Sequence, residues 1–299
     1  MDDWLQYTVN GLTAGSFYAL VALGYTMVYG VIRLINFAHG DFFMVGAFFG
    51  WSVLSGLAGS GWPVGVVLAV GLLVSMAATG VLGVVAARIA YQPLLRAPRL
   101  SILISALGLS LALEYSVEGI YGPGFESYPA VLRGRALSIA GVGVTVSQLA
   151  IAAAAVALMA ALHTFVQRTP LGTAMRALAM DQDAARLMGI DVERVILLTF
   201  FVGTSLAAAA GFLSGVYYGQ INFLMGFLLG LRAFTAAVLG GIGNIPGAMV
   251  GGVLIGLLES YASGYVSGAW KDVAVFAVLI AVLVVRPSGI FGERVVERV

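Results

Sequence analysis

The chain has 299 residues, of which 61% are hydrophobic and only 10% are charged, and its formal net charge is +1. Soluble domains carry about 25% charged residues, and no water-soluble chain of this length can hide so much apolar surface. These values predict an all-α polytopic membrane protein. They exclude nucleic-acid binding, because the few basic residues are scattered at helix ends. The absence of cysteine excludes disulfides and thiolate metal sites.

Nine apolar segments predict about eight to nine transmembrane helices, since each has close to the ~20 residues that span a bilayer. The segment 223–241 contains glycine and could instead be re-entrant or broken. The start, MDDWLQY, lacks the basic region of a cleaved signal peptide, and Trp4 and Tyr7 are typical interface anchors of a retained span. The segments are 8–32, 37–57, 63–87, 100–121, 144–166, 193–217, 223–241, 246–264 and 270–286.

Arginines concentrate at three places, which the positive-inside bias assigns to the cytoplasm. All three agree with one membrane topology, in which the N-terminus is outside and the C-terminus is cytoplasmic. Arg133 and Arg135 are a mild exception, because they lie in a Pro- and Gly-containing segment expected to be an external loop with a short hairpin. The cytoplasmic groups are Arg88, Arg96 and Arg99; then Arg168, Arg176, Arg186 and Arg194; and finally Arg286, Arg294 and Arg298.

An internal repeat supports this membrane topology. Ile35-Asn36-Phe37 is followed by Gly40 and Ala47-Phe48, and Ile221-Asn222-Phe223 is followed at the same offsets by Gly226 and Ala233-Phe234. The two copies enter their segments from opposite sides, so the sequence predicts an inverted-topology repeat, with chance similarity as the alternative. The chain is then one transmembrane domain, 1–299. Its parts are the repeat halves at about 8–121 and 193–286, an external loop at 122–143, a linking helix at 144–167 and a cytoplasmic stretch at 169–194.

Several polar residues interrupt the apolar segments. His39 and Asp41 could form a proton relay or a metal pair, but two ligands are too few for a closed metal site, which favours helix capping and interface polarity. Glu114 and Glu118 share a helix face and either line a polar route or reach toward the external loop. Arg232 must face the bundle interior or a wet cavity, and Glu259 is its expected partner, either along a pathway or in a structural ion pair.

The stretch Thr169–Arg194 is the least lipid-like part of the chain. Thr169 followed by Pro170 predicts a helix start, and a short helix over roughly Gln182–Met188 is expected to end at Gly189. Asp191 is the expected cap of the next helix, with Glu193 in its first turn. The result is a compact helix–turn–helix with an apolar knob of Leu187, Met188 and Ile190. It is either an ordinary solvated loop or a surface that docks into a partner groove.

The chain has no nucleotide-binding loop, because the glycines of 240–247 are not followed by Lys-Ser or Lys-Thr. It also lacks the common catalytic motifs. We therefore expect neither enzyme activity nor a cofactor, and any ATP energy must arrive mechanically from another protein.

Four stretches together resemble the membrane-spanning permease of Liv-type importers, the ABC transporters for branched-chain amino acids, and most closely its LivH-like type. The resemblance covers essentially the whole chain but is weak for substrate, since similar permeases serve urea or amide importers. The stretches are Asn10–Gly30, Ile35–Gly40, Ala184–Ile190 and, counted as one, the two end runs Leu239–Gly247 and Arg286–Gly292.

This resemblance implies a heterodimer of two homologous permeases in the bacterial inner membrane, with two cytoplasmic ATP-binding subunits and a periplasmic solute-binding protein. It also implies that part of the cytoplasmic stretch is the helix that docks on the ATPase. The leading acidic residue of that motif is not clearly matched, and Asp181 or Asp183 stands in its place. The implied coupling residues are Asp183, Ala184, Ala185, Arg186, Leu187, Met188, Gly189 and Ile190.

The expected activity is translocation of a branched-chain or similar amino acid, with Asn36, Asn222, Arg232 and Glu114 as candidate pathway residues. A permease for urea or amides is the related alternative. A stand-alone secondary transporter would instead couple ions through its intramembrane carboxylates. An intramembrane enzyme would need a catalytic pair at one depth, and the sequence offers no clean one.

Overall fold

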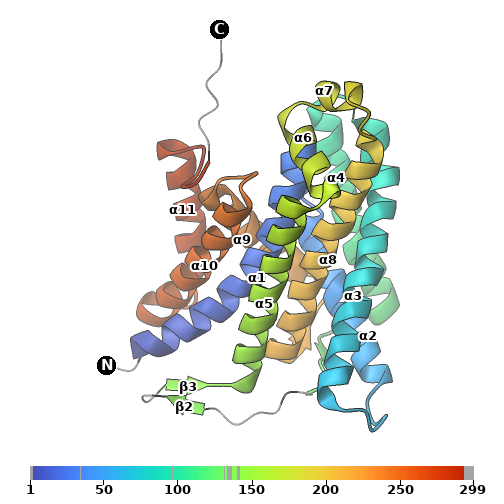
Figure 1. Cartoon of the computed structure of the whole chain (residues 1–299). Coiled ribbons are helices and arrows are strands. Elements are labelled where there is room, and N and C mark those ends of the chain that lie inside the picture. The colour runs from blue at the N-terminus through green and yellow to red at the C-terminus, as the bar shows by residue number, and fades with distance from the viewer. Residues whose placement is uncertain are drawn as a thin grey trace.

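The computed structural model of the chain describes residues 3–33, 35–95, 97–130, 132, 137–139 and 142–292 (Figure 1). Its helices are α1 (Asp3–Ile32), α2 (His39–Gly56), α3 (Val64–Ala86), α4 (Arg99–Tyr121), α5 (Val146–Arg168), α6 (Pro170–Met180), α7 (Gln182–Leu187), α8 (Val192–Tyr218), α9 (Met225–Gly240), α10 (Ile245–Tyr261) and α11 (Lys271–Val285). The π-helical turns η1 (Ala87–Tyr91) and η3 (Ala262–Val266) continue α3 and α10, and η2 (Gln92–Leu94) is a 3-10 turn. The strands are β1 (Glu126–Ser127), β2 (Leu137–Ile139), β3 (Val142–Val144) and β4 (Gln220–Ile221).

The helices confirm the predicted all-α polytopic class. Among the described residues, six helices are long and apolar enough to cross a membrane: α1, α3 with its extension, α4, α5, α8, and α10 with its extension. The other three predicted segments are also helical, but α9 has only 16 residues, α11 has 15, and α2 carries His39 and Asp41 in its first turn. By length and composition, six spans are therefore supported among the described residues, and the predicted eight to nine are not confirmed.

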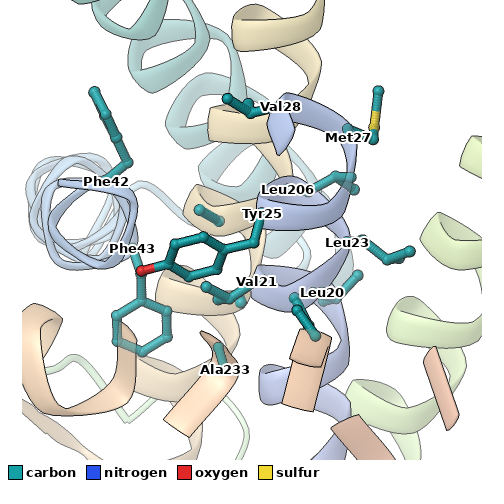
Figure 2. Close-up of a cluster of buried hydrophobic side chains, with 14 of the residues drawn as sticks. Leu20, Val21, Leu23, Tyr25, Met27, Val28, Phe42, Phe43, Leu206 and Ala233 are labelled. Atoms are coloured by element: carbon teal, nitrogen blue, oxygen red, sulfur yellow. The ribbon is translucent and has the colours of Figure 1, made fainter. Parts of the chain in front are cut away.

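The helix α1 is the centre of the bundle. Its residues from Phe17 to Leu23 are almost fully buried, and it packs most extensively against α10 and α8. Figure 2 shows side chains of α2, α8 and α9, among them Phe43, Leu206 and Ala233, gathered around Tyr25 and its neighbours on α1. A helix that is apolar on all sides is stable only where protein or lipid surrounds it, and here the surroundings are protein.

Small residues let α1 and α10 approach closely. Gly256 lies against the backbone of Gly15, and Gly252 lies against Ala19, so a side chain at either glycine of α10 would collide with the backbone of α1. Inside a bilayer the hydrophobic effect does not hold helices together, because lipid is as apolar as leucine, and close packing of small residues takes its place.

Both α2 and α9 begin inside the bundle. The first residue of α2, His39, packs against Gly24, which lies eight residues before the end of α1 and hence about 12 Å along the axis from that end. Gly226, in the first turn of α9, lies against Gly40 of α2, where an added Cβ would come within 2.8 Å of the Gly40 carbonyl oxygen. The first turns of the two short helices therefore meet at one place within the protein.

The molecule has two distinct ends in Figure 1. The N-terminus, β2 and β3 lie at one end, whereas α6, α7 and the last turn of α11 lie at the other. At the first end, β1 pairs with β4, and Tyr128 inserts between α2 and α8 with its ring against Gly50 and Gly215. The expected hairpin in 122–143 corresponds to β2 and β3, although Arg133 and Arg135 lie outside the described residues.

Candidate functional site

Local hydrogen bonds build the two short helices between α5 and α8. The Thr169 side chain accepts from the Gly172 amide at 3.0 Å and starts α6. The Asp181 carboxylate accepts from the amides of Asp183 and Ala184 at 2.9 and 3.0 Å and starts α7. The helix ends before Gly189, which has a φ of +82°, and Asp191 caps α8 through the Arg194 amide. The helix–turn–helix predicted from these residue types is confirmed.

We call α6, α7 and the turn to α8, residues 169–191, the coupling stretch, after the role that the sequence resemblance predicts for it. Its tip is apolar and open: Leu187 is 89% exposed and Met188 is 83% exposed. Met180, at the end of α6, is a further apolar residue of this stretch that is 82% exposed, and sequence reasoning did not select it. The remaining predicted coupling residues divide into exposed Asp183, Ala184, Arg186 and Gly189, half-buried Ile190 and buried Ala185.

The coupling stretch is tied to the end of the central helix. The Gln182 side chain donates to the Val31 carbonyl at 2.8 Å. Arg33 has a φ of +52°, which turns the chain sharply after α1 and lets its guanidinium donate to the Ala179 and Met180 carbonyls at 3.0 and 3.3 Å. A displacement of α6 and α7 would therefore be transmitted directly to α1.

A cavity of about 60 Å³ lies between the coupling stretch and the bundle. Thr26, Met175, Arg176 and Thr199 are among the residues that line it. The Thr26 hydroxyl is buried and has no hydrogen-bond partner in the described part of the protein. The packing between the coupling stretch and the bundle is therefore incomplete at this place.

Asn36 lies deep in the protein rather than on an open surface. It is 2% exposed, and its Oδ1 atom accepts a hydrogen bond from the Tyr91 hydroxyl at 2.5 Å. Asn222 lies in the turn before α9, is half-buried, and accepts from the Leu224 amide at 3.0 Å. The two matching asparagines of the repeat therefore occupy different environments.

Asp41 and Glu114 lie together inside the bundle. Ser110 donates to Asp41 Oδ2 at 2.5 Å, and the carboxyl group of Glu114, one turn further along α4, lies beside that of Asp41. Glu114 is 7% exposed, so it faces the interior, whereas Glu118 is half-buried. The ring nitrogens of His39 are buried without a partner, and the described residues contain no group of three or more potential metal ligands.

Arg232 is the centre of a network that we call the ionic cluster: Tyr18, Arg232, Glu259, Lys271 and Asp272. The expected pair with Glu259 is present at 3.0 Å. Asp272 accepts two further bonds from the guanidinium, at 2.6 and 2.8 Å, and Lys271 lies 3.5 Å from Glu259. The Tyr18 hydroxyl donates to Glu259 and accepts from Arg232. Sequence reasoning missed Tyr18, Lys271 and Asp272.

The predicted pathway residues do not converge on one open surface of this chain. Asn36, Glu114 and Arg232 are all below 10% exposed, and the structure places Arg232 in the ionic cluster, away from the Asp41–Glu114 contact. Most of the polar groups described above therefore belong to a buried group around the start of α2, to the ionic cluster on α9 to α11, or to the exposed coupling stretch.

A bundle of apolar helices with buried ionisable groups and an apolar tip at one end is an integral membrane protein with the features of a transport subunit. The family described as "Branched-chain amino acid transport system / permease component" matches residues 7–283. The chain is 42% identical to the "High-affinity branched-chain amino acid transport system permease protein LivH" of Escherichia coli strain K12, over 99% of this chain and 98% of that protein. It is 43% identical to the corresponding protein BraD of Pseudomonas aeruginosa, over the same shares.

The chain therefore belongs to the family of permease components of branched-chain amino acid transport systems. A solved structure titled "PsaBC from Streptococcus pneumoniae in complex with Fab" is similar with a TM-score of 0.48 at 11% identity, over 96% of this chain and 91% of that chain.

Proposed function

We propose that the chain is the membrane-spanning permease subunit of an ABC importer that carries branched-chain amino acids across the inner membrane. The observation that carries this proposal is the 42% identity over 99% of the chain to a permease of a high-affinity branched-chain amino acid system. ATP would be hydrolysed by partner subunits, since the sequence has no phosphate-binding loop. The pattern of arginines supports a cytoplasmic location for the end that carries α6 and α7, with the N-terminus outside.

The partners in this proposal are two cytoplasmic ATP-binding subunits, a second homologous permease and a periplasmic solute-binding protein. The coupling stretch would be the contact with an ATP-binding subunit. Leu187 and Met188 offer an apolar tip in an aqueous location, and exposed Asp183 and Arg186 flank it, which suits docking into a groove. The bonds from Gln182 and Arg33 to the chain around α1 and α6 would carry movement of the stretch into the bundle.

We further propose that α1–α4 and α8–α11 are inverted repeat halves, with α2 and α9 as broken helices that complete about eight to nine membrane segments. Three features support this arrangement. Gly40 and Gly226, which match in the sequence repeat, contact each other. The third helix of each half, α3 and α10, continues into a π-helical turn. The first helix of each half packs on the third helix of the other, α1 on α10 and α8 on α3.

The solute path would form only in the assembled pair of permeases, because the candidates Asn36, Glu114 and Arg232 are buried within this chain and Asn222 is half-buried. The external binding protein would make the main choice of solute. The identity to branched-chain amino acid permeases favours that substrate class over urea or amides.

The test is ATP-driven leucine uptake by the reconstituted complex, with and without Leu187→Asp. A charge at the apolar tip should abolish copurification of the ATP-binding subunit and uptake together. Phe125→Asp is the matched control, because Phe125 is a large apolar residue that is 69% exposed beside β1, at the opposite end of the molecule, so the ATP-binding subunit should still copurify. Leucine uptake by the permease alone, driven by an ion gradient, would contradict the proposal.

A further inference from the structure

The ionic cluster joins three helices within the apolar part of the protein. Arg232 lies in the middle of α9, Glu259 lies near the end of α10, and Lys271 and Asp272 begin α11. The guanidinium contacts both carboxylates, and Tyr18 of α1 completes the network. Ionisable groups in membrane helices are costly and are functional candidates by default.

The cluster is electrically balanced. It contains two cationic side chains, Arg232 and Lys271, and two carboxylates, Glu259 and Asp272, so its formal charge is zero. A solute that carries one charge would leave an uncompensated charge in a medium of low dielectric constant, which is expensive. A zwitterion can exchange partners with the cluster while the total charge stays zero.

The cluster is closed on one side and open on the other. The side chains of Arg232 and Glu259 are each 11% exposed, whereas Asp272 is 33% exposed and Lys271 is 36% exposed. The open groups begin α11, in which Val275 is the sole buried residue of the described helix. A solute could therefore reach the Asp272–Arg232 contact from the α11 side without crossing the packed core.

We propose that the ionic cluster is a transient binding site for the main-chain groups of a zwitterionic amino acid during its passage. The solute carboxylate takes a place on the Arg232 guanidinium beside or instead of Asp272, and the solute ammonium group binds the carboxylates of Asp272 and Glu259. This inference rests on the proposed function and specifies what this chain recognises. The cluster recognises the carboxylate and ammonium groups of the solute by their charges, and the apolar side chain of the solute makes no ionic contact.

The structural alternative is that the cluster only fastens α11 to α9 and α10. Charge pairs of this kind are not required for that purpose, because replacing a buried ion pair by apolar residues is often neutral or stabilising. The two roles make different predictions for a variant that keeps the fold but replaces the partly exposed carboxylate of Asp272. If the cluster is a recognition site, the variant loses transport alone. If the cluster only holds the helices together, the variant loses assembly and transport together.

The experiment compares Asp272→Asn with the wild type in the complete reconstituted complex. Leucine uptake is expected to fall by about tenfold or more, as for loss of a charge-assisted hydrogen bond, while ATP hydrolysis stimulated by the binding protein changes by less than about twofold. Asp272→Glu should recover much of the uptake. The matched control is Asp3→Asn, which removes an exposed carboxylate at the start of α1 and should leave uptake unchanged.

A second variant covers the case in which Asp272→Asn fails to assemble. Lys271→Gln keeps the contacts of Arg232 with Glu259 and Asp272 but removes one positive charge from the cluster, so the complex should assemble while leucine uptake falls. Uptake unchanged by Lys271→Gln, or unchanged by Asp272→Asn, would overturn the inference. If the binding protein does not stimulate ATP hydrolysis in the wild-type complex, that result would instead count against the proposed function itself.

Discussion

The coupling stretch and the ionic cluster are two polar regions of an apolar molecule, and they are built in opposite ways. In the coupling stretch, Asp181 bonds to amides two and three residues away, and the apolar tip is open to solvent. In the ionic cluster, Arg232 bonds to Asp272, 40 residues away, and to Tyr18, 214 residues away. The short helices of the first region are started by local caps, and Gln182 and Arg33 then tie the region to the end of α1. The second region depends on the arrangement of four helices.

This difference predicts different responses to mutation. Loss of a local cap lowers the stability of one short helix and leaves the bundle intact. Loss of one partner in a buried network leaves another charge uncompensated and affects every helix that contributes to it. The four predictions below begin with the largest expected effect.

Arg232→Leu should have the largest effect, because it leaves the carboxylates of Glu259 and Asp272 without their main partner. Breaking a buried charge network costs about 3–5 kcal/mol. Thermal unfolding of the purified protein in detergent should show a lower transition temperature. Arg194→Gln, which removes an exposed arginine with an 83% exposed side chain, serves as the control. Equal stability of the two variants would mean that the cluster is not a coupled network.

Gly189→Val should have the next largest effect and should act only on the coupling stretch. Gly189 has a φ of +82°, where a residue with a Cβ is strained by about 1–2 kcal/mol. The turn between α7 and α8 should distort, and ATP hydrolysis should become uncoupled from leucine uptake. The bundle should unfold at the wild-type temperature, and a lower transition temperature would contradict the separation of the two regions. Gly59→Val is a useful comparison, since its φ is also positive, at +81°, but it lies at the opposite end.

Asp181→Ala should remove the cap of α7 and cost about 1 kcal/mol of local stability. Hydrogen exchange of the α7 amides should accelerate by about fivefold, which is the factor expected for that free energy. Amides of α8 should be unaffected, because Asp191 caps that helix independently. Faster exchange throughout α8 would show that the coupling stretch is not a separate unit.

Arg186→Gln should have the smallest effect. Arg186 lies 3.8 Å from Asp183, and both side chains are largely exposed. The pair therefore contributes roughly a few tenths of a kcal/mol at most to the stability of the fold. Uptake should decrease modestly, through weaker attraction to the partner rather than through a change in folding. An uptake as low as that of Leu187→Asp would mean that charge, rather than the apolar tip, dominates docking.

The same contrast explains what the sequence could predict. Thr169, Asp181, Gly189 and Asp191 act on neighbouring residues, so residue type alone was enough to place α6, α7 and the start of α8. The positions of all nine apolar helices were also predictable, because hydrophobic runs are local. The buried state of Asn36 was not, since it depends on Tyr91, which approaches from another part of the chain.

The ionic cluster was predicted only in part for the same reason. Arg232 and Glu259 stood out as charges inside apolar segments, and their pairing could be expected from adjacency of the two segments. Lys271 and Asp272 resembled ordinary charges at a helix start, because nothing in the sequence indicates that α11 begins beside the middle of α9. Met180 was overlooked because its exposure depends on the turn between α6 and α7.

The most direct test of the central claim is site-specific crosslinking from the tip of the coupling stretch. The natural chain has no cysteine, so Leu187→Cys provides a single attachment point for a photoreactive maleimide in the assembled complex. We predict an adduct with the ATP-binding subunit, and none from Phe125→Cys, a position that is 69% exposed beside β1 at the opposite end of the molecule. Efficient crosslinking to the ATP-binding subunit from Phe125→Cys, or no adduct from Leu187→Cys in a complex that still transports leucine, would contradict the assignment of this stretch as the point where ATP energy enters.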